Sequence, residues 1–396
     1  MQPVSLLLIS DTYPPVIGGS ETEAQRVASG LIRRGHRVEV WTSGGPPMPA
    51  VRDWTDPAGV PVRILTRDSR GRQKDFAFAF RVATGIWRRR HEFDLIYFLM
   101  QGLHLAAGLP VTRLANKPLI MKFGGSGVIP LMRSSRAGRV ELEWLKKWAD
   151  RLLVLNQGMI DEALADGFRR EQLYWMPNPT DTTHFRPAEK TERSQLRAHC
   201  HLPETAFVVL YIGRLSHEKG LPWLLDGFAR LAAGRPEALL VLLGNGALRG
   251  ELESQAARLG IAGQVRLPGG VPPDDVAKWA RAADVFALTS PSEGFSCALA
   301  EAMSSGLPAV LSDIPANHQL VRDQQEGLYV KTGQVEAIGQ ALAALAAEPD
   351  RRAAYGAAAR ERIVSHYSLD RVVNLYEELF ADILERRATA TNRGKS

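Results

Sequence analysis

Apolar residues in this chain come in short continuous runs, separated by longer stretches with helical spacing. Short apolar runs bounded by Gly, Pro or Asp are typical of strands that are buried on both faces. In the first half of the chain the predicted strands are residues 4–10, 36–42, 95–100, 118–122 and 152–155. The clearest amphipathic helix covers residues 21–34 and is followed by Gly35, which favours a helix end. This alternation predicts a parallel sheet with helices on both faces.

The same alternation restarts after Pro187. Here the predicted strands are residues 207–212, 238–243, 265–267, 285–288 and 309–311. We therefore expect an α/β protein with two tandem, doubly wound, Rossmann-like domains. The predicted organisation is a first domain at 1–186, a linker at 187–203, a second domain at 204–368, a helix at 369–387 that packs back on the first domain, and a disordered tail at 388–396.

Composition supports an ordinary globular protein. The chain has 396 residues, of which 45% are hydrophobic and 23% charged, a balance and length that fit two domains. Its two cysteines, Cys200 and Cys297, are too few for a disulfide framework or a metal cage, and the start reads as a strand and not as a signal peptide. We expect a reduced, cytoplasmic protein without a membrane-spanning segment.

Charge is distributed unevenly. The net charge is +6, and the basic excess lies in the first half of the chain. Its clusters are Arg63, Arg67, Arg70, Arg72 and Lys74, then Arg88, Arg89 and Arg90, then Arg133, Arg136, Arg139, Lys146 and Lys147. Such clusters form either a solvated basic face or a surface for an anionic membrane or acidic acceptor, where each basic residue gains about 1 kcal/mol near anionic lipid. No pattern typical of nucleic-acid binding is present in the sequence.

Two motifs directly follow the first predicted strand of each half. Tyr13-Pro-Pro-Val-Ile-Gly-Gly leads into a helix, and Gly18 and Gly19 allow the backbone to approach an anionic ligand closely; the alternative is a turn needed only for chain reversal. Gly213-Arg-Leu-Ser-His-Glu-Lys-Gly carries Arg214 and Lys219, which together can neutralise a diphosphate, or which belong to a solvated basic loop.

Two further motifs follow later strands of the second half. Gly244-Asn-Gly is by itself a turn signal. Pro291-Ser-Glu-Gly-Phe leads into a helix predicted to begin near Phe295, and it places Glu293 in the loop and Glu301 in the helix. The alternative is a capped surface helix with two solvated glutamates. Because carboxyl ends of parallel strands share one edge, we expect both glutamates near the two cations, beside helix N–H groups that favour a diphosphate.

These motifs resemble those of glycosyltransferase family 4, the retaining group 1 glycosyltransferases, in the same order and over most of the chain. Leu31-Ile-Arg-Arg-Gly-His, Ala283-Asp-Val-Phe and the Gly-Leu-Pro at 306–308 add to the resemblance. It implies the GT-B fold with a deep cleft between two domains, the second holding a nucleotide-sugar donor and the first the acceptor. It also implies a metal-independent reaction without a cofactor, in which the leaving phosphate takes the acceptor proton.

The resemblance also implies residue roles. Glu293 would contact donor-sugar hydroxyls and Glu301 the ribose, while Arg214 and Lys219 would hold the diphosphate; Arg214, Lys219 and Glu293 are the predicted catalytic residues. The other implied donor contacts are Gly18, Gly19, Gly244, Leu267, Gly294, Phe295, Ser296 and Cys297.

The chain departs from the family pattern in two places. Many relatives have a histidine where Gly124 stands, and we propose Lys122 and His104 as substitutes for its sugar or acceptor contact, with a structural His104 as the alternative. Asn178-Pro stands where relatives have Asn-Gly, and Asn178 is the third acceptor candidate.

The predicted function is therefore the transfer of a hexose-type sugar, from UDP-sugar in the first instance, to a hydroxyl of a glycan, lipid-linked or small-molecule acceptor in cell-surface or exopolysaccharide assembly. The alternatives are a GDP- or ADP-sugar transferase, a non-catalytic nucleotide-sugar-binding subunit, and an epimerase or phosphorylase of related fold. The sequence selects no particular sugar, acceptor or oligomeric state.

Overall fold

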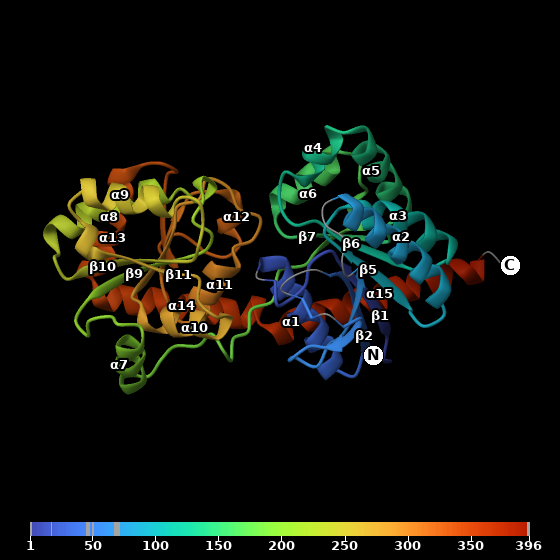
Figure 1. Ribbon diagram of the computed structural model, residues 1–396, viewed down its shortest axis with the longest axis horizontal. Helices are drawn as coiled ribbons and strands as arrows, with labels where there is room; N and C mark the ends of the chain where they lie inside the picture. Colours follow the sequence, from blue (N-terminus) through green and yellow to red (C-terminus); the bar gives the residue numbers. More distant parts are fainter. Residues whose placement is uncertain (1, 17, 45–47, 50, 67–71, 394–396) are drawn as a thin grey trace. The chain divides into compact units, whose positions relative to one another are not determined.

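The computed structural model describes residues 2–16, 18–44, 48–49, 51–66 and 72–393. The chain forms two compact units (Figure 1). Unit 1 comprises Met1–Pro179 and Leu369–Ser396, and unit 2 comprises Thr180–Ser368. Arg67, Arg70 and the last three residues of the predicted tail lie outside the described residues.

Unit 1 is built on an eight-stranded sheet with the order β3-β4-β2-β1-β5-β6-β7-β8. All neighbouring strands are parallel except β3 and β4. Its strands are β1 (Ser5–Ser10), β2 (Arg37–Ser43), β3 (Asp53–Thr55), β4 (Pro61–Thr66), β5 (Leu95–Leu99), β6 (Leu119–Lys122), β7 (Arg151–Val154) and β8 (Leu173–Trp175). Its helices are α1 (Gly19–Arg33), α2 (Arg72–Arg89), α3 (Leu103–Leu114), α4 (Val128–Arg133), α5 (Arg136–Trp148), α6 (Gln157–Ala165), η1 (Arg170–Gln172) and α15 (Leu369–Arg393).

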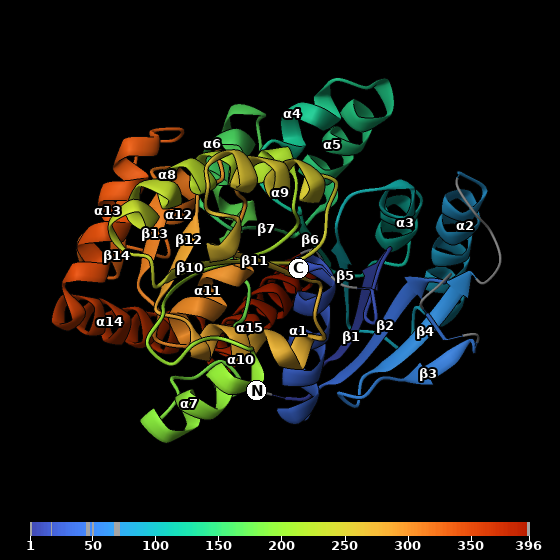
Figure 2. The same ribbon diagram turned by 60° about the vertical axis from the view of Figure 1, so that its left-hand side comes forward.

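The apolar strands of unit 1 are covered on both faces, as their continuous hydrophobic runs require. Alternate residues of β1, Leu6 and Leu8, pack in one core with α1 and α15. On the opposite face, Phe98 of β5 packs against α3, where a side chain at Gly108 would collide with its ring. Figure 2 shows α2 and α3 over one face of this sheet, and α1 and α15 over the other. The predicted doubly wound sheet is thus confirmed for unit 1.

Helix α15 returns to unit 1 from the end of unit 2 and completes its core. Tyr376 and Phe380 are fully buried, and the Tyr376 hydroxyl lies 3.2 Å from the hydroxyl of Tyr97 in β5. Arg151 at the start of β7 forms an ion pair with Asp382. The helix continues to Arg393, whereas the tail was predicted to be disordered from residue 388.

Unit 2 is built on a six-stranded parallel sheet with the order β11-β10-β9-β12-β13-β14. Its strands are β9 (Phe207–Ile212), β10 (Ala238–Leu243), β11 (Val265–Gly269), β12 (Val285–Leu288), β13 (Ala309–Ser312) and β14 (Gly327–Val330). Its helices are α7 (Lys190–His199), η2 (His217–Lys219), α8 (Leu221–Gly234), α9 (Arg249–Arg258), η3 (Ala262–Gln264), α10 (Pro273–Ala282), α11 (Cys297–Ser304), α12 (Pro315–His318), α13 (Val335–Ala347) and α14 (Pro349–Tyr367). This is the second doubly wound domain that the sequence predicts.

Unit 2 begins earlier in the chain than residue 204, and residues 187–203 are not a linker in this structure. Arg360 of α14 donates hydrogen bonds to the carbonyls of Thr182 and Phe185 at 2.9 and 2.7 Å. Arg197 of α7 is buried and donates to Asp284 at 2.7 Å. These arginine contacts with backbone and carboxylate groups fix residues 180–203 to unit 2.

Truncation of Phe380 tests whether α15 is part of the core of unit 1. Phe380→Ala removes a fully buried ring, so we expect the free energy of unfolding to fall by about 3–5 kcal/mol in urea titrations. The matched control is Phe80→Ala in α2, where the ring is 69% exposed and the expected change is within about 0.5 kcal/mol. Equal losses in the two variants would contradict the packing described here.

Candidate functional site

In unit 2 the candidate site lies where the strand order reverses. The chain passes from β9 outward to β10 and β11, and then returns to β12 on the other side of β9. In parallel α/β sheets, ligands bind at the carboxyl ends of the strands where the strand order reverses in this way. Lys219 lies in the loop after β9, and Glu293 in the loop after β12.

Glycines allow the loops at this edge to approach one another closely. A Cβ atom at Gly244 would lie 2.0 Å from the carbonyl oxygen of Gly213, and one at Gly246 would lie 2.1 Å from that of Leu215. Gly220 has a φ of 63°, and a Cβ there would lie 2.3 Å from the carbonyl oxygen of Thr289. Side chains are excluded at these positions, so the loops after β9, β10 and β12 form one layer of backbone.

Lys219 and Glu293 form an ion pair across this edge. Lys219 Nζ donates to Glu293 Oε1 at 2.8 Å, and the two side chains are 23% and 9% exposed. Thr289, which sequence reasoning missed, supports the pair because its hydroxyl donates to the Gly220 carbonyl at 3.0 Å. The structure thus brings together two predicted catalytic residues that are 74 positions apart in the sequence.

Arg214 is fixed at its backbone and exposed at its head group. The Tyr211 hydroxyl donates to the Arg214 carbonyl at 2.9 Å. Burial, reinforced by Glu293, raises the pKa of Tyr211, so this phenol stays protonated as a donor. The Arg214 side chain is 74% exposed, and its nearest carboxylate is Glu218 at 3.6 Å. The head group is therefore accessible to an anion at this edge.

Helix α11 begins at Cys297, two residues later than predicted, because Ser296 caps it. The Ser296 hydroxyl accepts a hydrogen bond from the Leu299 N–H at 3.2 Å. The ring of Phe295 packs against the ring of Tyr367, with 5.9 Å between the ring centroids. Glu301 and Cys297 are half-buried on the helix, and Gly294 lies in the loop between Glu293 and the cap. The predicted donor-contact residues 293–297 are thus contiguous with the Lys219–Glu293 pair.

Leu267 lies on β11, two strands away from β9. Its carbonyl accepts a hydrogen bond from Arg249 Nη2 at 2.9 Å. A pocket of about 300 Å³ adjoins it, lined by Arg249, Glu253, Ala256, Ala262, Val265, Arg266 and Leu267. The implied donor contact Leu267 thus lies beside a cavity, with its carbonyl already hydrogen-bonded.

In unit 1, Gly18 and Gly19 lie at the start of α1, at the carboxyl end of β1. The carboxylate of Glu21 folds back onto this turn, where a Cβ atom at Gly18 would lie 2.2 Å from Glu21 Oε2. This carboxylate accepts from the Ser20 hydroxyl at 3.0 Å. A protein carboxylate therefore lies at the helix N-terminus where the sequence predicts a phosphate contact.

Lys122 and Asn178 lie together in the interior of unit 1. Lys122 is 1% exposed; its amine donates to Asn178 Oδ1 at 2.8 Å and forms an ion pair with Glu23 of α1. Burial raises the pKa of Glu23, and Lys122 opposes that shift. These contacts favour a structural role for both predicted acceptor residues, and no sequence signal pointed to Glu23 as the partner.

His104 is also buried, between the rings of Phe78 and Phe98. Burial lowers its pKa to about 4, while Asp11, the Met100 backbone and Asp75 act in the opposite direction. Its Nε2 atom has no hydrogen-bond partner among the described residues. The structure therefore favours the structural alternative for His104, a neutral ring packed under the carboxyl end of β5.

Comparison with known families identifies both halves of the chain. Residues 192–362 match the model described as glycosyl transferases group 1, and residues 18–179 match the glycosyl transferase 4-like domain. A lipopolysaccharide core biosynthesis glycosyltransferase, LpsE of Rhizobium meliloti, is 26% identical over 332 residues, covering 82% of this chain and 91% of that protein. The alpha-monoglucosyldiacylglycerol synthase of Streptococcus pneumoniae is 25% identical over 357 residues, covering 87% and 78%.

Solved structures share the fold. The crystal structure of HepE from Anabaena in complex with UDP and glucose has a TM-score of 0.80 at 21% identity and covers 96% of this chain and 100% of its own. Sucrose-phosphate synthase from Thermosynechococcus elongatus has a TM-score of 0.79 at 22% identity, with coverage of 96% and 100%. These are GT-B glycosyltransferases, so the predicted fold is confirmed.

Acid titration tests the structural role of His104. Because its folded pKa of about 4 lies below the ordinary value of 6.5, the unfolded chain binds more protons between these values, and stability falls as the pH falls through that window. At roughly 1.4 kcal/mol per pKa unit, this loss approaches about 3 kcal/mol. We expect His104→Gln to flatten the dependence of the free energy of unfolding on pH between about pH 6.5 and 4, measured in urea titrations. The control is His91→Gln, at an exposed position of unit 1, which should leave this dependence unchanged. Parallel profiles would contradict this assignment.

Proposed function

Since this chain belongs to the group 1 glycosyltransferases, we propose that it transfers a hexose-type sugar from a UDP-sugar to a hydroxyl of a glycan or lipid-linked acceptor, with retention of anomeric configuration. The observation that carries the proposal is the Lys219–Glu293 pair at the carboxyl ends of β9 and β12, where the strand order reverses. Lys219, Glu293 and the loop that leads into α11 meet at this edge of the sheet.

The charge that develops in the reaction explains the residue types. When the bond between the anomeric carbon and the donor phosphate oxygen breaks, the electron pair goes to the diphosphate, and Lys219 and Arg214 stabilise it. An ammonium group has three N–H donors, so Lys219 can keep its bond to Glu293 while it contacts a phosphate. The carboxylate of Glu293 is suited to accept hydrogen bonds from sugar hydroxyls.

The acceptor oxygen then bonds to the anomeric carbon, and its proton passes to the leaving phosphate. In this proposal the reaction needs no metal ion and no separate protein base. If the rate of sugar transfer is unchanged after treatment with EDTA, metal independence is supported. If EDTA abolishes transfer and only an added divalent cation restores it, metal independence is refuted.

The relatives support a nucleotide-sugar donor and leave the nucleotide to experiment. HepE from Anabaena was crystallised with UDP-glucose, in a structure with a TM-score of 0.76 and 22% identity. The GDP-mannose-dependent phosphatidylinositol monomannoside mannosyltransferase of Mycobacterium tuberculosis is 30% identical over 205 residues, covering 50% of this chain and 53% of that protein. We favour UDP because a structure that resembles this chain over 96% of its length holds it.

Variants of the ion pair test the proposed catalytic site. We first expect one nucleotide sugar in a panel of UDP-, GDP- and ADP-sugars to raise the melting temperature most, since stabilisation grows with RT ln(1 + [L]/Kd). With that donor, Lys219→Met is expected to lower kcat for transfer or donor hydrolysis by about 10²–10³, because leaving-group stabilisation is lost. Glu293→Gln is expected to lower kcat/KM in the same assay.

Lys278→Met and Glu336→Gln are matched controls, since both side chains form more exposed ion pairs elsewhere in unit 2. They should retain the full rate. If Lys219→Met and Glu293→Gln were as active as these controls, the proposed site would be wrong. If no donor in the panel shifted the melting temperature or reacted, a nucleotide-sugar enzyme would be excluded.

We further propose that unit 1 contacts an anionic membrane surface through one face of α2. Phe76, Phe80 and Trp87 are 62%, 69% and 46% exposed, and their spacing puts them within one stripe of the helix. The guanidinium of Arg90 lies 4.5 Å from the Trp87 ring centroid, which adds positive charge to the stripe. Aromatic side chains beside basic ones are typical of helices that bind at a membrane interface.

No helix within the described residues is both long and apolar enough to cross a membrane. In this proposal the protein works in the cytoplasm, with α2 at the inner face of the plasma membrane. Acceptors of two relatives agree with that location, because their names specify diacylglycerol and phosphatidylinositol lipids.

Cosedimentation with phosphatidylglycerol vesicles tests the α2 surface. Phe76→Ser/Phe80→Ser removes two exposed rings, so we expect the bound fraction to fall several-fold while the melting temperature stays within a few degrees. Leu164→Ser, an exposed apolar residue at the end of α6, is the control and should leave the bound fraction unchanged. Equal binding of the wild type and the double variant would refute contact through α2.

A further inference from the structure

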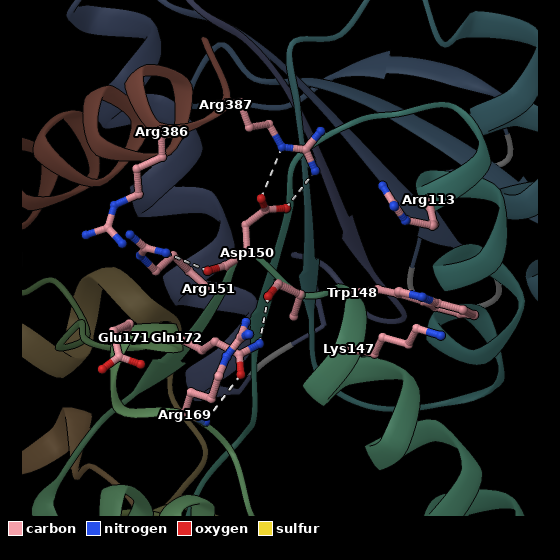
Figure 3. Close-up of a pocket in the computed structure, with 11 residues that line it drawn as sticks. Arg113, Lys147, Trp148, Asp150, Arg151, Arg169, Glu171, Gln172, Arg386 and Arg387 are labelled. Atoms are coloured by element: carbon pink, nitrogen blue, oxygen red, sulfur yellow. Dashed lines mark hydrogen bonds and ion pairs between the residues drawn. The ribbon is translucent and has the colours of Figure 1, made fainter. Parts of the chain in front are cut away.

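A basic cavity lies on unit 1, at the amino ends of β7 and β8. It has a volume of about 510 Å³. Its lining residues are Arg113, Lys147, Trp148, Ala149, Asp150, Arg151, Arg169, Glu171, Gln172, Arg386 and Arg387 (Figure 3). Asp150 and Gln172 directly precede β7 and β8, whereas Lys122 is the last residue of β6 and His104 lies at the start of α3, after the carboxyl end of β5. The cavity is therefore at the edge of the sheet opposite to the acceptor candidates.

The back of this cavity is held by hydrogen bonds between segments that are far apart in the sequence. Arg387 of α15 donates to both carboxylate oxygens of Asp150, at 3.1 and 3.0 Å, and to the Asn116 carbonyl at 3.0 Å. The Leu119 N–H donates to Asp150 at 2.8 Å. Gln172, which is buried, donates to the carbonyls of Lys146 and Ala149 at 3.0 and 2.9 Å. The cavity thus has a preformed wall.

Positive charge in the cavity exceeds the negative charge available to neutralise it. Asp150 is neutralised by Arg387, and Asp382 is shared between Arg151 and Arg386. Arg113, Lys147 and Arg169 form no ion pair among the described residues. Glu171, which is exposed, is the remaining carboxylate of the lining. An uncompensated cluster of this kind attracts a multiply charged anion.

The positions of the side chains suit such a ligand. In Figure 3, Arg113, Lys147 and Trp148 lie on one side of the cavity, and Arg151, Arg169 and Arg386 lie on the other. Trp148 stacks on Trp144 with 5.3 Å between the ring centroids, so its indole is a fixed wall. Guanidinium groups match phosphate oxygens with paired N–H donors, and a ligand with two phosphate groups is a multiply charged anion.

We propose that this cavity is a binding site for a ligand with two phosphate groups, held between Arg113 and Lys147 on one side and Arg169 on the other. The indole of Trp148 would cover the non-phosphate part of the ligand. Both a soluble diphosphate and a lipid headgroup with two phosphates present this chemistry. The site belongs to unit 1 and is separate from the Lys219–Glu293 pair of unit 2.

Calorimetric titration with inorganic pyrophosphate at low salt tests the proposal. Every protein carries Lys219→Met, so that anion binding at the candidate donor site is weakened equally. We expect Arg113→Gln/Arg169→Gln to bind pyrophosphate at least tenfold more weakly than Arg52→Gln/Arg136→Gln, which removes the same charge at exposed positions outside the cavity. Orthophosphate is expected to bind more weakly than pyrophosphate to the control pair.

Vesicles of phosphatidylcholine with cardiolipin, a lipid that carries two phosphates, identify the source of the ligand. A soluble diphosphate is indicated if pyrophosphate binding is lost in Arg113→Gln/Arg169→Gln while this double variant and the control double variant bind vesicles equally. Vesicle binding that is lost in Arg113→Gln/Arg169→Gln and kept in the control pair indicates a lipid headgroup. If the two double variants bind pyrophosphate equally and bind vesicles equally, the proposal is overturned. Melting temperatures within a few degrees of each other exclude misfolding as the cause of a difference in binding.

Discussion

Close approach of backbone to backbone at the carboxyl edge of the sheet in unit 2 is the constraint on which its candidate site depends. Gly213 and Gly244 bring the loops after β9 and β10 into contact, and Gly220 brings the loop after β9 against the end of β12. A side chain at Gly220 or Gly244 would force these loops apart. Because the loops meet, Lys219 and Glu293 can pair at 2.8 Å from two different strands. The chemistry of the site therefore rests on positions that carry no side chain.

Each unit has a lysine–glutamate pair near the carboxyl edge of its sheet, and burial separates their roles. Lys122 is 1% exposed and is engaged by Glu23 and Asn178, so its charge is neutralised inside unit 1. Lys219 is 23% exposed and has capacity for a further acceptor. Both lysines lie near the carboxyl end of a parallel strand, Lys122 as the last residue of β6 and Lys219 in the loop after β9. The number of surrounding partners decides which lysine is available to a ligand, and sequence patterns carry no information on that number.

Sequence patterns located most of the central strands and missed most of the edge strands. The predicted residues 207–212, 238–243 and 285–288 coincide with β9, β10 and β12, since continuous apolar runs mark strands buried on both faces. The edge strands β3, β8 and β14 were missed, and so was β4, which lies between β3 and β2 and contains Pro61 and Arg63. The edge strand β11 was predicted at 265–267. Edge strands have fewer neighbours and are therefore less constrained in hydrophobicity. Residues 388–393, predicted to be disordered, continue the long α15 helix instead.

The sequence by itself determined the doubly wound fold, the family, and the set of charged residues that follow the strands of unit 2, because periodicity and local motifs encode these directly. Tertiary structure decided which of those residues meet. It paired Lys219 with Glu293 across 74 positions, buried Lys122 and His104, and extended unit 2 back to residue 180 through Arg360. It also assembled the basic cavity from α3, α5, the loop before β8 and α15. Such groupings depend on contacts between distant segments and on burial, which exist only once the chain has folded.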